Sequence, residues 1–174
     1  MFEEVTLVLS DIESNNIEEM EKKMKSNSSV ILPNYLTAKN NMLYVINDSE
    51  TKKNVGVIYL YDINSINQNA CIDGFVIEDK YISKLIISYL LLMYKGMIEL
   101  NLHKIYAKHL VGDAYYKRIY DFLRFTLEGD FRDDVNRAGK FYDVQVRSIL
   151  KHEFIRYYLT GGNNLQKVFR LEGF

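Results

Sequence analysis

Strand-type and helix-type segments alternate along this chain in an order that restricts the folds open to it. Runs rich in β-branched and aromatic residues span 4–10, 42–47, 55–63, 70–77, 103–109, 125–131 and 140–152, and helix-type runs span 11–25, 83–100 and 113–123. The polar links 48–54, 64–69 and 133–139 indicate turns between neighbouring antiparallel strands. A helix between two strands indicates a crossover connection. The sequence therefore predicts a mixed α/β fold around a mostly antiparallel sheet.

No internal repeat or linker interrupts this order, so we expect one domain over residues 1–154. The remaining segment, 155–174, is expected to be either part of the same domain or a dimer contact. Its apolar residues would need covering. We therefore expect a homodimer, with the last strands or this tail at the interface.

Charge and cysteine content exclude several function classes. The 22 Lys and Arg residues balance 23 Asp and Glu residues, which argues against nucleic acid as the main ligand. Cys71 is the single cysteine, so an internal disulfide framework is excluded. The acidic start of the chain does not resemble a signal peptide, and the apolar run 85–94 is far shorter than the roughly 20 residues of a membrane span. We expect a cytoplasmic protein without a membrane partner.

Motifs for metal or nucleophilic chemistry are missing from the sequence. His103, His109 and His152 do not stand at metal-ligand spacing, so we expect no metal site. There is also no nucleophile elbow and no phosphate-binding P-loop. These motifs alone predict no more than a soluble α/β domain.

The second half of the chain carries a resemblance to a known family. The relevant text is LHKIY at 102–106, IYDFLRFTLEGDFR at 119–132, GKFYDV at 139–144 and SILKHEF at 148–154. It resembles the GNAT N-acetyltransferase superfamily, specifically its RimJ/RimL-like branch, where a helix ends in Leu-Tyr-x-x-x-Gly-Phe before Glu-Gly and an Arg. Arg124 replaces the glycine of that pattern here.

The resemblance implies a sheet splayed between its fourth and fifth strands, with helices on both faces and acetyl-CoA in the wedge. The pantetheine would pair with the fourth strand at Phe75, Val76 and Ile77. The pyrophosphate would rest on the following loop and helix N-terminus, where backbone N–H groups and the helix dipole favour an anion.

The pyrophosphate loop departs from the family pattern, which is Arg or Gln-x-x-Gly-x-Gly or Ala. The equivalent stretch is 80–85 when counted back from the fifth strand and 82–87 when counted forward from the fourth strand. Its candidate cofactor-binding residues are Lys80, Ser83, Lys84 and Leu85, and neither register contains the glycines. Glycine allows close approach of the backbone to a phosphate. Either Lys80 and Lys84 supply charge and acetyl-CoA still binds, or the cofactor site is lost and the chain is an inactive GNAT-fold binding or scaffold protein.

Two further positions follow from the resemblance. Asp113 occupies the place of an asparagine that contacts the cofactor, although an ordinary helix N-cap explains an aspartate equally well. Tyr120 matches a tyrosine near the thioester sulfur and is the candidate general acid for the leaving thiolate. A half-buried aromatic residue on an amphipathic helix is the structural alternative.

Asp73 is the candidate general base. Period-two alternation places it on one face with Cys71, Phe75 and Ile77, and these apolar neighbours would raise the pKa of its carboxyl. A carboxylate satisfied by backbone or tyrosine donors is the alternative. By analogy of fold, Arg132 and Tyr142 are expected to line the acceptor side.

Together these features predict an acetyl-CoA-dependent N-acetyltransferase that acts without a metal. Its acceptor would be a primary amine of a small molecule or peptide, attacking the thioester directly. The abundance of tyrosine mildly favours a ring-shaped or sugar-like acceptor over a polycation.

Overall fold

The computed structural model describes residues 5–9, 41–48 and 50–160. Within them the chain forms a seven-stranded sheet in the order β1-β2-β3-β4-β5-β7-β6. Its strands are β1 (Val5–Leu9), β2 (Met42–Asp48), β3 (Lys53–Asn64), β4 (Asn69–Val76), β5 (Lys104–Leu110), β6 (Thr126–Arg137) and β7 (Lys140–Leu150). Only β4 and β5 run parallel; the other neighbouring strands are antiparallel. The mixed α/β fold predicted from the sequence is confirmed.

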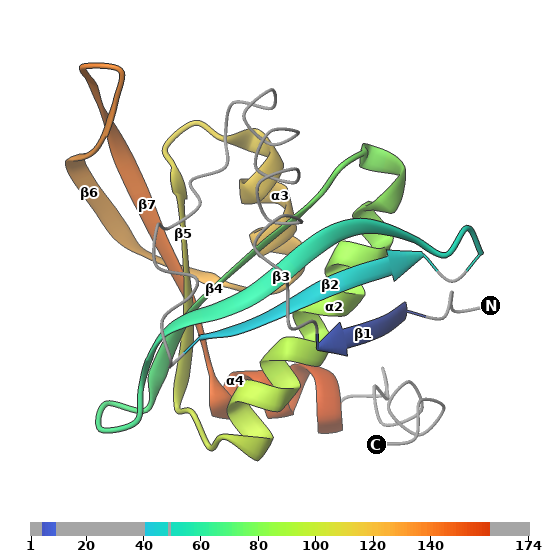
Figure 1. Ribbon diagram of the computed structural model, residues 1–174. Coiled ribbons are helices and arrows are strands. Elements are labelled where there is room, and N and C mark those ends of the chain that lie inside the picture. The colour runs from blue at the N-terminus through green and yellow to red at the C-terminus, as the bar shows by residue number, and fades with distance from the viewer. Residues whose placement is uncertain (1–4, 10–40, 49, 161–174) are drawn as a thin grey trace.

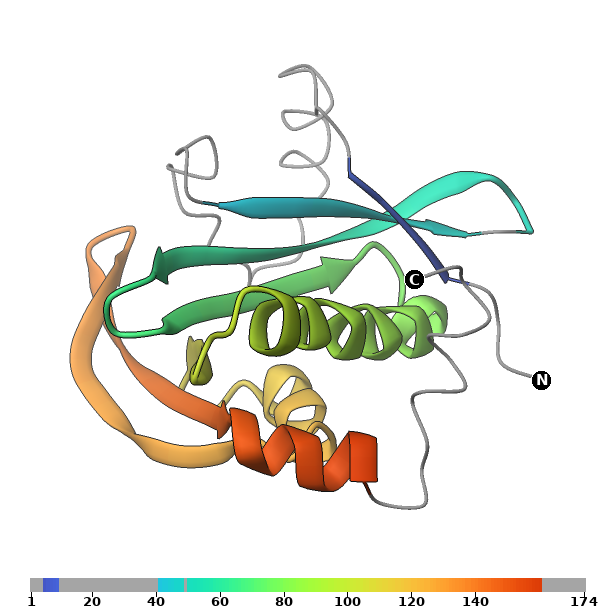
Figure 2. The ribbon, with the colours of Figure 1, turned by 90° about the horizontal axis from the view of Figure 1, so that it is seen from below.

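The helices of the described residues gather on one face of this sheet, as Figure 2 shows for α2, α3 and α4. A 3-10 turn, η1 (Asp79–Tyr81), leads into α2 (Ile82–Tyr94), which continues as the π-helical η2 (Lys95–Glu99). The other helices are α3 (Ala114–Phe122), α4 (Lys151–Phe154) and η3 (Ile155–Thr160). The predicted helix 11–25 and the segment 161–174 lie outside the described residues.

The main hydrophobic core lies between the sheet and these helices. Alternate residues of β3 and β4, such as Ile58, Leu60 and Ile72, meet Leu85 and Leu92 of α2 there, and all are nearly inaccessible to solvent. The segment Asp79–Glu99 is long and apolar enough to cross a membrane by length and composition alone. Its burial against the sheet accounts for this composition, because a core helix needs an apolar surface on several sides.

Strands β6 and β7 form a long hairpin. The sequence predicted a turn over 133–139, but β6 continues to Arg137 and the turn consists of Ala138 and Gly139. Both turn residues have positive φ, 49° and 83°, as a two-residue type I′ hairpin requires. The polar residues that indicated this turn lie instead at the end of β6, where the strand is largely exposed to water. The strand predicted to reach residue 152 also ends earlier, since Lys151 begins α4.

Candidate active site

The sheet opens where β4 and β5 part. Their parallel pairing is limited to three residue pairs, Asn69 with Lys104, Ala70 with Ile105 and Cys71 with Tyr106. Beyond Cys71, β4 stays paired with β3, whereas β5 stays paired with β7. The two strands therefore diverge, as Figure 1 shows, and the rest of β4 lacks a strand partner on this side. This is the splay between the fourth and fifth strands that the sequence predicted.

Asp73 lies on β4 just past this junction and is 9% exposed. Its Oδ2 accepts a hydrogen bond from the Tyr59 hydroxyl at 3.1 Å, and its Oδ1 accepts one from the Gly74 N–H at 2.7 Å. The Tyr89 hydroxyl donates to Oδ1 at 3.5 Å. Burial raises the pKa of this carboxyl to about 7, although these donors act in the opposite direction. Asp73 can therefore change its protonation state near neutral pH.

Four buried tyrosines surround Asp73 and Gly74, and we call Tyr59, Tyr89, Tyr116 and Tyr120 the phenol cluster. The Tyr116 hydroxyl donates to the Gly74 carbonyl at 3.4 Å, and the Tyr89 hydroxyl lies at the same distance from that oxygen. The Tyr89 and Tyr120 hydroxyls lie 3.3 Å apart. Burial raises the pKa of all four phenols well above its ordinary value. Each therefore stays protonated and able to donate a hydrogen bond at neutral pH.

Helix α3 supplies two members of the phenol cluster. Tyr116 and Tyr120 are four residues apart on one helix face, so their rings stack with centroids 6.0 Å apart. Asp113 is the N-cap of α3, and its Oδ1 accepts hydrogen bonds from the Tyr115 and Tyr116 N–H groups at 3.0 and 3.2 Å. This cap fixes the start of the helix and with it the position of both rings.

Residues of the predicted pyrophosphate loop separate into two environments. Lys80 and Ser83 are exposed, and the Lys80 ammonium lies 2.9 Å from Glu78 Oε2. Lys84 is instead buried in an ion pair with Asp48 of β2, and Leu85 is 0% exposed in the main core. Of the two loop lysines, only Lys80 therefore faces solvent near the start of α2.

The predicted pantetheine strand lies beside the phenol cluster. Phe75 and Val76 are buried and pair with Val57 and Gly56 of β3. The Ile77 N–H donates to the Val55 carbonyl at 2.9 Å, so this backbone donor points toward β3.

The predicted acceptor residues lie farther along the chain, on the β6–β7 hairpin. Arg132 is exposed and falls in an irregular stretch of β6, between Phe131 and Val135. Tyr142 on β7 is partly exposed, with the Lys140 ammonium 5.0 Å from its ring centroid. The phenol cluster belongs to β3, α2 and α3, so the structure does not place these two residues among it.

Sequence reasoning missed Tyr59, Tyr89, Tyr116 and also His109 as members of this region. His109 on β5 is 6% exposed, and its ring centroid lies 5.6 Å from that of Tyr120. Its Nδ1 lies 3.0 Å from the Leu110 carbonyl oxygen, while Nε2 is buried without a hydrogen-bond partner. Burial lowers the pKa of this imidazole, and Arg147 lowers it further. His109 is therefore neutral at neutral pH.

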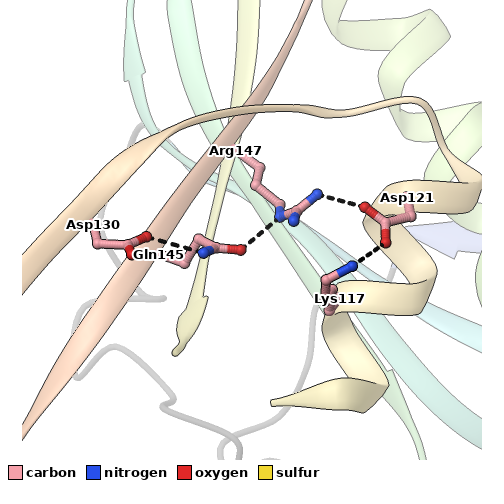
Figure 3. A network of polar contacts seen from close by, with 5 residues as sticks. All are labelled: Lys117, Asp121, Asp130, Gln145 and Arg147. Atoms are coloured by element: carbon pink, nitrogen blue, oxygen red, sulfur yellow. Dashed lines mark hydrogen bonds and ion pairs between the residues drawn. The ribbon is translucent and has the colours of Figure 1, made fainter. Parts of the chain in front are cut away.

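A polar network holds α3 against β7 on the other side of the helix (Figure 3). Arg147 donates from Nη1 to Asp121 Oδ1 at 2.6 Å and from Nε to Gln145 Oε1 at 2.9 Å. Lys117 extends the network at Asp121 Oδ2, and Asp130 extends it at Gln145. Because Arg147 is buried and donates in two directions, it fixes the helix that carries Tyr120.

The described residues contain no group of three His, Cys, Asp or Glu side chains that could hold a metal ion. Around Asp73 the structure brings together a carboxyl group, phenols and a backbone donor, and these groups suit proton transfer. Cys71 is buried, and burial raises the pKa of its thiol, so it does not act as a thiolate nucleophile.

Comparison with known proteins identifies the fold. The chain is similar to a probable acetyltransferase at 19% identity and a TM-score of 0.71, over 86% of this chain and 94% of that one. It is similar to a mutant of the spermidine N-acetyltransferase SpeG from Vibrio cholerae at 18% identity and a TM-score of 0.70, over 87% and 97%. Mutant forms of the spermidine/spermine N-acetyltransferase SpeG from the same organism match at 20% identity and a TM-score of 0.70, over 87% and 96%. No family model and no curated protein matches the sequence. The chain thus has the fold of the GNAT acetyltransferases, as its sequence predicted.

Proposed function

We propose that this protein is an N-acetyltransferase that moves an acetyl group from acetyl-CoA to a primary amine of a small molecule or peptide. The observation that carries the proposal is the placement of a titratable carboxyl, Asp73, and a protonated phenol, Tyr120, at the splay of an acetyltransferase fold. The RimJ/RimL-like branch is part of the proposal and rests on the sequence resemblance. We also propose the cytoplasm as its location, since a single cysteine, Cys71, fits a reducing compartment.

The Asp73 carboxyl suits the removal of a proton from the amine, and the Tyr120 phenol suits the protonation of the leaving thiolate. An amine must lose a proton as it attacks the thioester carbonyl, and a carboxylate with a pKa near 7 is a suitable base for that step. The thiolate that leaves must gain a proton, and a phenol held protonated by burial can donate one. No covalent intermediate on the protein is required.

Acetyl-CoA would lie along β4, with its pantetheine beside Phe75, Val76 and Ile77. Backbone donors of β4 would polarise the thioester carbonyl. The pyrophosphate would meet the start of α2, where Ser83 and Lys80 are exposed, and not the buried Lys84. Asp113 would act through its cap on α3, since its carboxylate is already engaged by two backbone donors.

The acceptor side is assigned to the β6–β7 hairpin, where Arg132 and Tyr142 lie. The solved SpeG structures are spermidine N-acetyltransferases, so a polyamine joins sugars and peptides among the amines to test. We also propose a homodimer through this hairpin, which exposes Leu127, Phe131 and Phe141. Light scattering on purified protein tests this, and a monomer at all concentrations would exclude it.

One observation favours a second function, that of an inactive GNAT-fold binding or scaffold protein. The loop lacks the glycines of the family, and Lys84 and Leu85 are committed to the protein interior. A loop fixed in this way has less freedom to wrap a pyrophosphate.

Calorimetric titration with acetyl-CoA separates the two functions, with CoA as a matched ligand. An acetyltransferase is expected to bind both in the micromolar range and to acetylate at least one amine from a panel of spermidine, glucosamine and a short peptide. Tyr120→Phe should then lower kcat more than it changes KM. Absence of binding at millimolar acetyl-CoA would favour the scaffold function.

A further inference from the structure

A continuous path of hydrogen-bonding groups joins Asp73 to Tyr120 through Tyr89. The Tyr89 hydroxyl lies 3.5 Å from Asp73 Oδ1 and 3.3 Å from the Tyr120 hydroxyl. Tyr89 and Tyr120 are both 0% exposed, so bulk water does not reach these contacts. A phenol can accept one proton and donate another at the same oxygen, so Tyr89 can pass a proton between its two neighbours.

The other phenols around Asp73 occupy different positions. Tyr59 donates to the opposite carboxylate oxygen, Oδ2, at 3.1 Å. Tyr116 donates to the Gly74 carbonyl, which is an alternative acceptor for the Tyr89 hydroxyl. The hydrogen bonds of Tyr89 link the candidate base to the candidate acid. Tyr120 itself also lies close enough to Asp73 to lower the pKa of that carboxyl by hydrogen bonding.

We propose that Tyr89 is a positioning residue that returns the proton from Asp73 to Tyr120 in each catalytic cycle. This inference rests on the proposed function. The amine nitrogen forms a bond to the acetyl carbon, the carbon–sulfur bond breaks, and Asp73 takes the proton from nitrogen. Tyr120 gives its proton to the thiolate sulfur, Tyr89 gives its proton to Tyr120, and Asp73 gives its proton to Tyr89. The products are an amide and a neutral thiol, and each protein group recovers its starting state.

The surroundings of the path favour internal return of the proton over exchange with solvent. Facing Asp73 are Tyr59 from β3, Tyr89 from α2, Tyr116 and Tyr120 from α3, and the Cys71 thiol on its own strand. No cation is among them. His109 lies against the Tyr120 ring from β5, and burial, with a smaller contribution from Arg147, lowers the pKa of that imidazole. Because the Tyr120 phenol is a much weaker acid than the Asp73 carboxyl, return of the proton moves the negative charge from Tyr120 to Asp73, where it is more stable.

Tyr89→Phe tests the path, because it keeps the ring and removes the linking hydroxyl. Tyr116→Phe is the matched control, since it removes another buried hydroxyl from the same Gly74 carbonyl. Each variant is assayed as the full chain with acetyl-CoA and the best amine of the panel, in mixtures of H2O and D2O. We expect Tyr89→Phe to lower kcat about tenfold or more, with a smaller change in KM. The dependence of kcat on D2O fraction should be curved for the wild type and Tyr116→Phe, and linear for Tyr89→Phe.

The same variants give a readout that does not depend on turnover. Tyr89 lowers the pKa of the Asp73 carboxyl, so Tyr89→Phe should raise the midpoint of the protonated-carboxyl band in infrared spectra. If the wild type is active and Tyr89→Phe has the same kcat and the same curved dependence on D2O fraction, the path is overturned. The proposed acetyltransferase function would stand in that case. A wild type inactive with every amine would overturn the proposed function and the path with it.

Discussion

Lys84 of α2 and Asp48 of β2 form an ion pair inside the protein, with Nζ 3.2 Å from Oδ1 and side chains 6% and 5% exposed. Removing one partner leaves a buried charge uncompensated, whereas removing both does not. We expect Asp48→Leu and Lys84→Met each to lower the Tm by several degrees, and the double variant to recover most of the loss. Thermal denaturation of the three variants measures this, and independent, additive losses would contradict it.

Lys80 is the loop lysine that faces solvent at the start of α2. If the pyrophosphate of acetyl-CoA lies there, Lys80→Ala should weaken binding about threefold to tenfold, as expected for one exposed charge. Lys84→Met is the matched comparison, and its affinity should change less because its charge is paired with Asp48. Calorimetry with acetyl-CoA measures both; a larger effect at Lys84 would place the pyrophosphate elsewhere.

The raised pKa of Asp73 predicts the pH profile of acetyl transfer. The base must be deprotonated, so kcat/KM should rise about tenfold per pH unit below pH 7 and level off above it. Tyr59→Phe removes a hydrogen bond that lowers the pKa of the Asp73 carboxyl. The rising part of the kcat/KM profile should therefore move to higher pH in this variant. Steady-state assays from pH 5 to about 9 measure this rise, and a profile independent of pH below 7 would exclude Asp73 as the base.

The same carboxyl makes folding stability depend on pH. Because its folded pKa of about 7 lies above the unfolded value near 3.8, the folded state binds the proton more tightly, and stability falls as pH rises from about 4 to 7. Asp73→Asn removes this penalty, which is about 4 kcal/mol for a shift of this size. The variant should be inactive yet more stable than the wild type, with a larger gain at pH 8 than at pH 5. Urea denaturation at both pH values measures the difference, and an equal gain at both would contradict it.

Gly56 lies where β3 and β4 pack too closely for a side chain. A Cβ there would be 2.3 Å from the Phe75 carbonyl oxygen, which belongs to the backbone and cannot turn aside. At Gly96 the nearest atom, 3.0 Å away, is a side-chain carbon of Ile105 that can move. Gly56→Ala should therefore cost about 1–3 kcal/mol or more and Gly96→Ala less. Equal losses in denaturant unfolding would mean that β3 and β4 can separate.

The sequence predicted the strands and helices well where the hydrophobic period was clear. The runs that became β2, β3, β4 and β5 end within two residues of their predicted bounds. It failed at the hairpin of β6 and β7, because strands exposed on both faces carry the polar residues that usually indicate a turn. Ala138 also gave no signal for the left-handed conformation that it adopts.

The candidate site was predictable in part. The apolar alternation partners of Asp73 predicted a raised pKa for its carboxyl, and the structure agrees; its role as the base stays a prediction. Tyr59 and Tyr89 were missed because they lie 14 and 16 residues from Asp73 in sequence. The β3–β4 register brings Tyr59 opposite Asp73, and the packing of α2 brings Tyr89 to it. Lys84 was a candidate to supply charge to the pyrophosphate, but it is buried in an ion pair with Asp48 of β2, a contact between segments far apart in sequence.

The short pairing of β4 with β5 divides the sheet into two blocks that can unfold separately. Strands β1–β4 form one block held by antiparallel pairing, and strands β5–β7 form another. The β4–β5 seam between the two blocks consists of three parallel residue pairs. Amide exchange should therefore report two cooperative blocks, with the seam as the least protected part of the sheet. A ligand held along β4 and α3 would bridge both blocks and merge them into a single unfolding unit.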